Sequence, residues 1–117
     1  MRRSEFIEWN RKIIERCKLY GGCHGLTRIG GGTACYLVHL LNALREDGVN
    51  RDGRDLILTN VVCVAERFLG ESPAQYNDTR PDPNTAPIKT AEYLISLAEE
   101  APLGFFDPEP IVVTIQN

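Results

Sequence analysis

The chain lacks several features that would assign it to a class of protein. No apolar run reaches the roughly 18 residues of a membrane-spanning helix. No apolar core of an export signal follows the first residues, so we expect a cytoplasmic location. There is no Cys-x-x-Cys pair of the kind common in zinc sites. The four cysteines are therefore expected to be free thiols in a domain that requires no cofactor and no membrane.

The chain also has no large excess of charge of either sign, because its formal net charge is only −3. This value argues against broad nucleic-acid binding. The charge is nevertheless uneven: residues 1–28 carry a net +4 and residues 29–117 a net −7. We expect the basic end to attract anionic ligands or acidic partners, although it could equally be the solvated face of the first helix.

Hydrophobic periodicity predicts an all-α fold, a compact four-helix domain that covers residues 1–117. The expected helices cover about 4–20, 34–46, 55–69 and 88–100, and a polar turn over residues 50–54 precedes the third. A glycine-rich loop over 21–33 and an extended loop over 71–87 connect them. The second helix is apolar almost all round, which predicts a central position with its leucines buried. These leucines are Leu37, Leu40, Leu41 and Leu44.

A short C-terminal strand is expected over residues 110–116, where the run Ile111 to Ile115 is rich in β-branched residues. No partner strand is evident elsewhere in the chain. An unpaired strand leaves backbone groups unsatisfied, so we expect either a homodimer through this segment or docking along its own domain.

The glycine-rich loop is the leading candidate for a ligand site. Six of the ten glycines lie within residues 21–35, and Thr33 is placed to cap the helix that follows. Backbone N–H groups and the dipole at a helix N-terminus bind anions, and an arginine can add a bidentate contact. The sequence matches neither a P-loop nor a dinucleotide-binding turn, and the loop could be only a connector. The predicted ligand contacts here are Cys23, His24, Arg28, Gly30, Gly31, Gly32 and Thr33.

The segment Tyr76-Asn77-Asp78 is a second candidate ligand contact. Asn and Asp side chains also stabilise turns through their own backbone, so a purely structural role is the alternative.

The cysteines and histidines could form two further kinds of site. In the first, Cys35 is a nucleophile activated by the helix N-terminus, His24 or His39 is its base, and Asp78 or Asn77 orients the histidine. Such an arrangement would make the protein a cysteine-dependent hydrolase or transferase. The second is a metal site, although its spacing matches no standard zinc pattern. Its candidate ligands are Cys17, Cys23, His24, Cys35 and His39.

Three segments together resemble a small family of unknown function from bacteria and bacteriophages. The family has Gly-Trp-Cys-x-Gly, Cys-x-x-Gly-Ala and Trp-Asn-Asp motifs followed by a short helix. The corresponding segments here are residues 21–25, 35–39, 76–78 and 90–98. Gly22 stands where the family has Trp, and Val38-His39 stands where it has Gly-Ala. The resemblance implies a mostly helical domain in a bacterial or phage setting, and it implies no reaction type.

These observations favour a non-catalytic binding protein with a small phosphorylated ligand such as a nucleotide. The first alternative is a protein-interaction module that inhibits a host protein, with Trp9 as a contact residue on the first helix. The cysteine-dependent enzyme is the second alternative.

Overall fold

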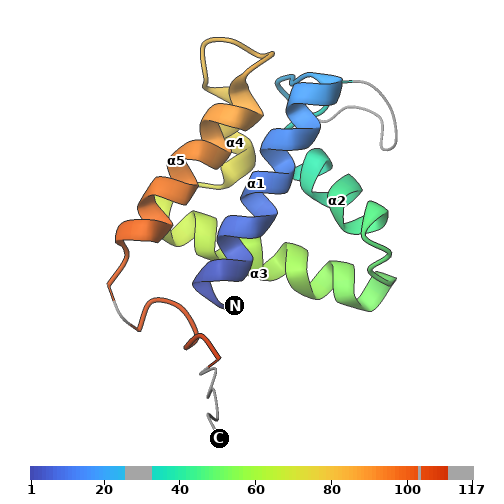
Figure 1. The fold of residues 1–117 in the computed structure, drawn as a ribbon. Coiled ribbons are helices and arrows are strands. Elements are labelled where there is room, and N and C mark those ends of the chain that lie inside the picture. The colour runs from blue at the N-terminus through green and yellow to red at the C-terminus, as the bar shows by residue number, and fades with distance from the viewer. Residues whose placement is uncertain (26–32, 103, 111–117) are drawn as a thin grey trace, which may run out of the picture.

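The computed structural model describes residues 1–25, 33–102 and 104–110. The fold is mostly helical, as predicted, and the described part of the chain contains no sheet (Figure 1). Its helices are α1 (Arg3–Tyr20), α2 (Tyr36–Glu46), α3 (Arg51–Leu69), α4 (Pro73–Asp78) and α5 (Ala86–Glu100). None of these helices is long and apolar enough to cross a membrane. The run Ile111 to Ile115, on which the predicted strand depends, lies outside the described residues.

The prediction of an extended loop over residues 71–87 is wrong, and with it the number of four helices. This segment contains α4 and the first two residues of α5. Helix α4 forms because Ser72 and Gln75 cap it reciprocally: the Gln75 N–H donates to Ser72 Oγ (3.1 Å), and the Ser72 N–H donates to Gln75 Oε1 (3.4 Å). Pro73 stands at the first helical position, where a missing N–H costs nothing.

Helix α2 begins two residues later than predicted, and its N-cap is Cys35 instead of Thr33. The reason is a backbone pairing between the two ends of the glycine-rich segment. The Ala34 N–H donates to the Gly21 carbonyl oxygen (3.3 Å), and the Cys23 N–H donates to the Ala34 carbonyl oxygen (3.3 Å). These bonds form an isolated parallel bridge, which holds the residues before α2 in an extended conformation.

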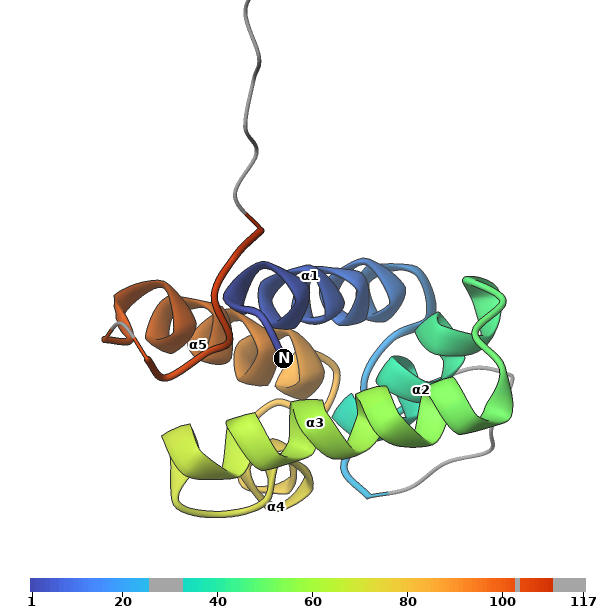
Figure 2. The same ribbon diagram turned by 90° about the horizontal axis from the view of Figure 1, so that it is seen from below.

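The helices form two layers. Helices α1 and α5 lie side by side, and α3 crosses beneath them (Figures 1 and 2). Helix α2 contacts each of the other four. Leu40 and Leu44 are fully buried, whereas Leu37 and Leu41 are half-buried, so α2 is less enclosed than its apolar pattern predicts. The fully buried core also includes Phe6, Ile13, Tyr36, Val61, Ala65, Ala91, Leu94 and Ala98.

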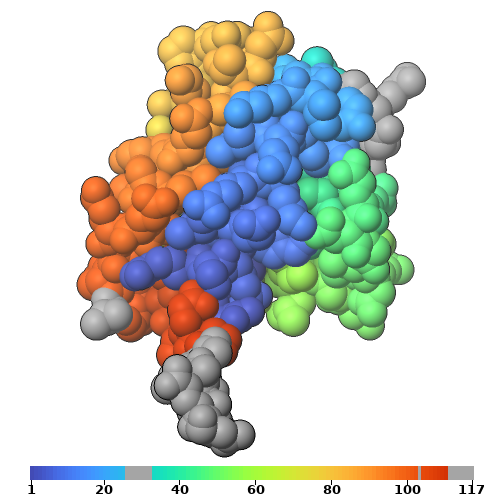
Figure 3. Space-filling view, viewed as in Figure 1, coloured from blue at the N-terminus to red at the C-terminus, as the bar shows by residue number. Residues whose placement is uncertain are grey.

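Polar contacts join α1 to α2 both inside the core and at the surface. The buried Tyr36 hydroxyl donates to Asn10 Oδ1 (2.8 Å), and Asn10 Nδ2 donates to the Phe6 carbonyl oxygen (2.8 Å). On the surface, Lys12 pairs with Asp47 and Arg16 pairs with Glu46. Figure 3 shows α1 between α5 and α2 on this face. Part of the basic surplus of the N-terminal region is therefore neutralised within the molecule.

Candidate functional site

The structure brings together two groups of residues that the sequence singled out separately. Residues 21–25 lie against residues 76–80, the end of α4 and the turn after it. Asn77 is fully buried, and its Nδ2 donates to the Cys23 carbonyl oxygen (3.0 Å). Asp78 Oδ1 accepts a hydrogen bond from the Gly25 N–H (2.7 Å), and His24 Nε2–H donates to the Arg80 carbonyl oxygen (2.7 Å).

These contacts bear on the predicted roles of the polar side chains. Asn77, Asp78 and His24 each use at least one polar atom to join the two segments. They hold the loop against α4, and they leave fewer polar atoms for a ligand than the sequence indicated. Their arrangement is that of a structural clamp at the edge of a site.

Gly22 fixes the position of this clamp relative to α5. Its N–H donates to the Asn84 carbonyl oxygen (3.1 Å). A Cβ atom at this position would lie 2.5 Å from Pro87 Cδ and 2.7 Å from the Asn84 and Pro83 carbonyl oxygens. No side chain fits there without moving the backbone, and this is the position at which the resembled family has Trp.

The first residue of the loop is held by α2. His39 is fully buried, and its Nε2–H donates to the Gly21 carbonyl oxygen (2.9 Å). Its Nδ1 atom is buried and has no hydrogen-bond partner in the described ranges. Burial lowers the pKa of His39, with a smaller lowering by the nearby Arg16 charge. The histidine is therefore a neutral structural donor.

The arrangement needed for a cysteine nucleophile is not assembled among the described residues. Cys35 is only 2% exposed, and burial raises the pKa of its thiol. His39 donates to Gly21 and His24 donates to Arg80, while Asp78 accepts from Gly25. A nucleophile needs its base within hydrogen-bond distance, and no such bond to Cys35 is found in this part of the chain. The described ranges also contain no group of three or more His, Cys, Asp or Glu residues arranged to hold a metal ion.

A hollow lies between α4 and α5, beside this clamp. It has a volume of about 410 Å³, within the usual range for ligand pockets. Tyr76 from α4 and Tyr93 from α5 stack with ring centroids 5.7 Å apart and planes 17° apart. The Arg80 guanidinium lies 3.8 Å from the centre of the Tyr76 ring. Among the described residues, its lining is Tyr76, Arg80, Pro81, Asp82, Thr85, Lys89 and Tyr93.

Only Tyr76 of this lining was predicted from the sequence. Arg80 is outside the predicted motif, and the packing of α4 on α5 is what brings Lys89 and Tyr93 opposite Tyr76. Lys89 and Tyr93 are one helical turn apart and both exposed, a pattern that places a cation and an aromatic ring on one helix face. This pair of residues on one helix face is the signal by which Lys89 and Tyr93 could have been found from the sequence. Of the other predicted contacts, Thr33 is exposed, and Arg28, Gly30, Gly31 and Gly32 lie outside the described residues.

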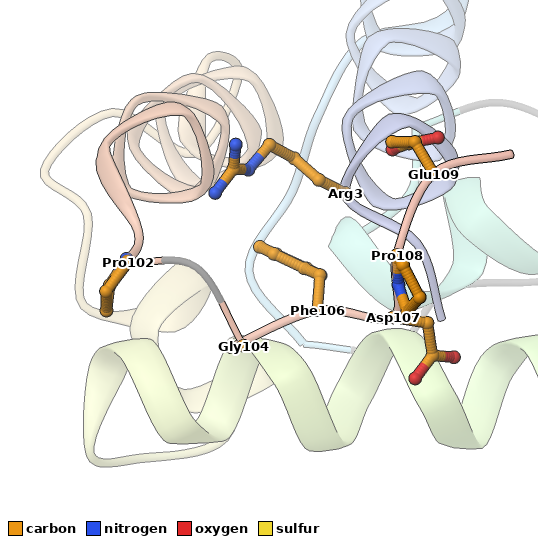
Figure 4. Close-up of a pocket in the computed structure, with 7 residues that line it drawn as sticks. All are labelled: Arg3, Pro102, Gly104, Phe106, Asp107, Pro108 and Glu109. Atoms are coloured by element: carbon orange, nitrogen blue, oxygen red, sulfur yellow. The ribbon is translucent and has the colours of Figure 1, made fainter. Parts of the chain in front are cut away.

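A second hollow, of about 330 Å³, lies between the start of α1 and the segment after α5 (Figure 4). Its charged groups already have partners within the protein. Arg3 Nη2 donates to the Ala101 carbonyl oxygen (2.6 Å), and its guanidinium lies 5.7 Å from the centre of the Phe106 ring. The two carboxylate oxygens of Glu109 accept hydrogen bonds from the N–H and hydroxyl groups of Ser4 (2.9 and 2.8 Å). We therefore interpret this hollow as part of the docking of the C-terminal segment.

Trp9, the predicted contact for a protein partner, is half-buried against the core. The Lys12 ammonium lies 4.9 Å from the centre of its ring. A ring that is both packed and partly covered offers less area to a partner than an exposed one. The more exposed apolar side chains are Leu19 (76%) and Leu56 (62%), which lie on α1 and α3.

Comparison of the chain with protein-family models, with curated proteins and with solved structures finds no match in any of the three.

Proposed function

We propose that this protein is a non-catalytic binding protein for a small phosphorylated ligand of the nucleotide class, with its site between α4 and α5. The observation that carries the proposal is the combination of two stacked tyrosines with Arg80 and Lys89 around one hollow. An aromatic wall suits a nucleobase, and the two cations suit a phosphate group.

The electrostatics of the hollow support an anionic ligand. Its charged lining consists of Arg80, Lys89 and Asp82. Asp82 Oδ1 already accepts a hydrogen bond from the Asn84 N–H (3.0 Å). Arg80 is held in place because its Nε donates to the Tyr76 carbonyl oxygen (3.1 Å) and its Nη2 to Thr79 Oγ1 (3.2 Å). A cation that is already oriented loses less side-chain entropy when a phosphate binds.

The cysteine-dependent alternative finds no support in this hollow, because the lining residues that the structure describes include no cysteine or histidine. A bacterial or bacteriophage setting is part of the proposal through the motif resemblance alone, and the binding site does not depend on it.

The first prediction tests this site with Lys89→Gln and Tyr93→Leu. Lys89→Gln removes a charge-assisted contact worth roughly 1.5–3 kcal/mol, so the affinity for nucleoside mono- and diphosphates should fall about 10- to 100-fold. Tyr93→Leu should reduce the affinity for nucleotides more than the affinity for inorganic phosphate, because it removes the aromatic surface on which a base would stack. Isothermal titration with nucleotides, nucleosides and inorganic phosphate measures these effects.

Matched controls are available on α1. Lys18→Gln removes an exposed lysine from another surface, and Tyr20→Leu removes a tyrosine that is 45% exposed against 44% for Tyr93. Both controls should bind as the unmodified protein does. If no nucleotide binds, or if Lys89→Gln binds as tightly as Lys18→Gln, the proposed site is wrong.

A further inference from the structure

Two cysteines face each other across the two ends of the glycine-rich segment. Gly22 and Ala34 form the parallel bridge, so Cys23 and Cys35 are the next residues in register on the two paired segments. Residues in register on adjacent segments have side chains on the same face, with backbones about 4.8 Å apart. Disulfides join residues whose Cα atoms are roughly 4.4–6.8 Å apart, so this register suits a disulfide.

Side-chain packing agrees with the register. Cys23 packs against the small buried cluster formed by Ala34, Cys35 and Val38. Burial raises the pKa of the Cys35 thiol, and a charge on Cys23 raises it further. Cys23 is half-buried, and its thiol donates to the Gly25 carbonyl oxygen (3.5 Å), whereas Cys35 is only 2% exposed.

We propose that Cys23 and Cys35 form a reversible disulfide by exchange with a low-molecular-weight disulfide of the glutathione type. The Cys23 thiolate attacks one sulfur of the reagent, which forms a mixed disulfide and releases one small thiolate. Cys35 then loses its proton, and its thiolate attacks Cys23 Sγ and displaces the second small thiolate. Overall, two protein thiols are oxidised, one small disulfide is reduced to two thiols, and the two protons pass to the released thiolates.

The bond would connect the redox state of the protein to the clamp beside the ligand hollow. The carbonyl of Cys23 accepts the hydrogen bond from Asn77, which lies next to Tyr76 on α4. A disulfide at Cys23 would fix this contact covalently to the start of α2. It would also restrict the unfolded chain, so the oxidised protein should melt at a higher temperature than the reduced one.

The experiment uses the full chain with Cys63→Ser, because Cys63 is exposed on α3 and would react by itself. The protein is incubated with oxidised glutathione, alkylated, digested and analysed by mass spectrometry. We expect a peptide pair linked through Cys23 and Cys35, with a mass lower by two hydrogens and no retained glutathione. Reduction with dithiothreitol should reverse both the link and the rise in melting temperature.

Two variants separate this pairing from the alternatives. In the Cys35→Ser variant the reaction should stop at a stable mixed disulfide between Cys23 and glutathione. The Cys17→Ser variant should form the Cys23–Cys35 disulfide as the protein with intact Cys17 does. Cys17 is the necessary comparison because its thiol also interacts electrostatically with Cys23. A linked Cys17–Cys23 peptide, or a Cys23–glutathione adduct that persists while Cys35 is intact, would overturn the proposal.

Discussion

His39 shows how one buried side chain connects the pH to the stability of the loop region. It lies on α2 and holds the Gly21 carbonyl oxygen through its Nε2–H, with Nδ1 buried. Burial lowers its pKa in the folded state. In the unfolded chain the pKa of a histidine is about 6.5, so below this pH the unfolded state binds more protons than the folded state. The stability contributed by neutral His39 is therefore complete above about pH 7 and is lost as the pH falls.

The second prediction is that the free energy of unfolding decreases as the pH is lowered from 7.5 to 5.5. The free energy of unfolding of the His39→Gln variant should decrease less over the same interval. Glutamine keeps an N–H donor for Gly21 but does not titrate. Denaturant unfolding at several pH values measures the difference. His24→Gln is the control, because His24 is exposed, and it should retain the pH dependence of the unmodified protein. Equal slopes for His39→Gln and the unmodified protein would contradict the assignment.

At the scale of the helices, the capping residues explain which predictions succeeded. The predicted end of α3 is confirmed: Gly70 has a left-handed conformation (φ 73°), and its N–H donates to the Glu66 carbonyl oxygen (2.9 Å). The helix begins at Arg51, four residues earlier than the predicted start at about residue 55, because the Asn50 side chain accepts from the Gly53 N–H (2.8 Å) and caps it. Asn50 is a standard N-cap residue, so the sequence carried a signal for this earlier start.

The missed helix α4 also carried its signal in the sequence. Ser72, Pro73 and Gln75 form a capping box with proline at the first helical position. The six residues of α4 are too few to show the hydrophobic periodicity that predicts the longer helices. In contrast, the late start of α2 depends on the pairing of Ala34 with Gly22. No local pattern indicates that pairing, because it joins residues at the two ends of a loop.

The third prediction concerns the uneven burial of α2. Leu44 is fully buried, so Leu44→Ala should reduce the free energy of unfolding by roughly 2–5 kcal/mol. Leu41 is only half-buried, and Leu41→Ala should cost about half as much, because less apolar surface is lost from the interior. Denaturant unfolding of the two variants measures both values. A cost for Leu41→Ala equal to or larger than that for Leu44→Ala would show that α2 is as enclosed as its sequence pattern indicated.

At the scale of the whole molecule, the candidate site was predictable only in part. The sequence singled out Cys23 and His24 and, separately, residues 76–78, and the structure brings them together. Lys89 and Tyr93 could not be assigned to the same place, because their position depends on how α5 packs against α4. The mostly helical fold followed from periodicity within single helices, whereas the site depends on the packing between them.

The packing of the C-terminal segment is a second property of the whole molecule. Residues 105–107 return from the end of α5 to the start of α1 and to α3. The Phe106 ring lies 5.8 Å from the Phe6 ring and 6.0 Å from the Phe68 ring, centroid to centroid. Phe105 stacks on Phe68 with centroids 4.4 Å apart, and the Asp107 N–H donates to the Met1 carbonyl oxygen (3.0 Å). This aromatic cluster joins three segments that are distant in the sequence.

The fourth prediction follows from this cluster. Phe106→Ala removes three aromatic contacts, with Phe6, Phe68 and Phe105, and part of the apolar cover over Phe6, so the free energy of unfolding should fall by about 2–3 kcal/mol. Tyr20→Ala is the matched control, because Tyr20 is 45% exposed and lies outside the cluster. Its ring contacts the Arg16 guanidinium, 4.8 Å from the ring centre, so this variant should change stability by less than about 1 kcal/mol. Denaturant unfolding compares the two, and limited proteolysis should show faster cleavage near residue 104 in Phe106→Ala. If the stabilities of the two variants are equal, the segment after α5 does not contribute to the core, and the hollow in Figure 4 loses its structural interpretation.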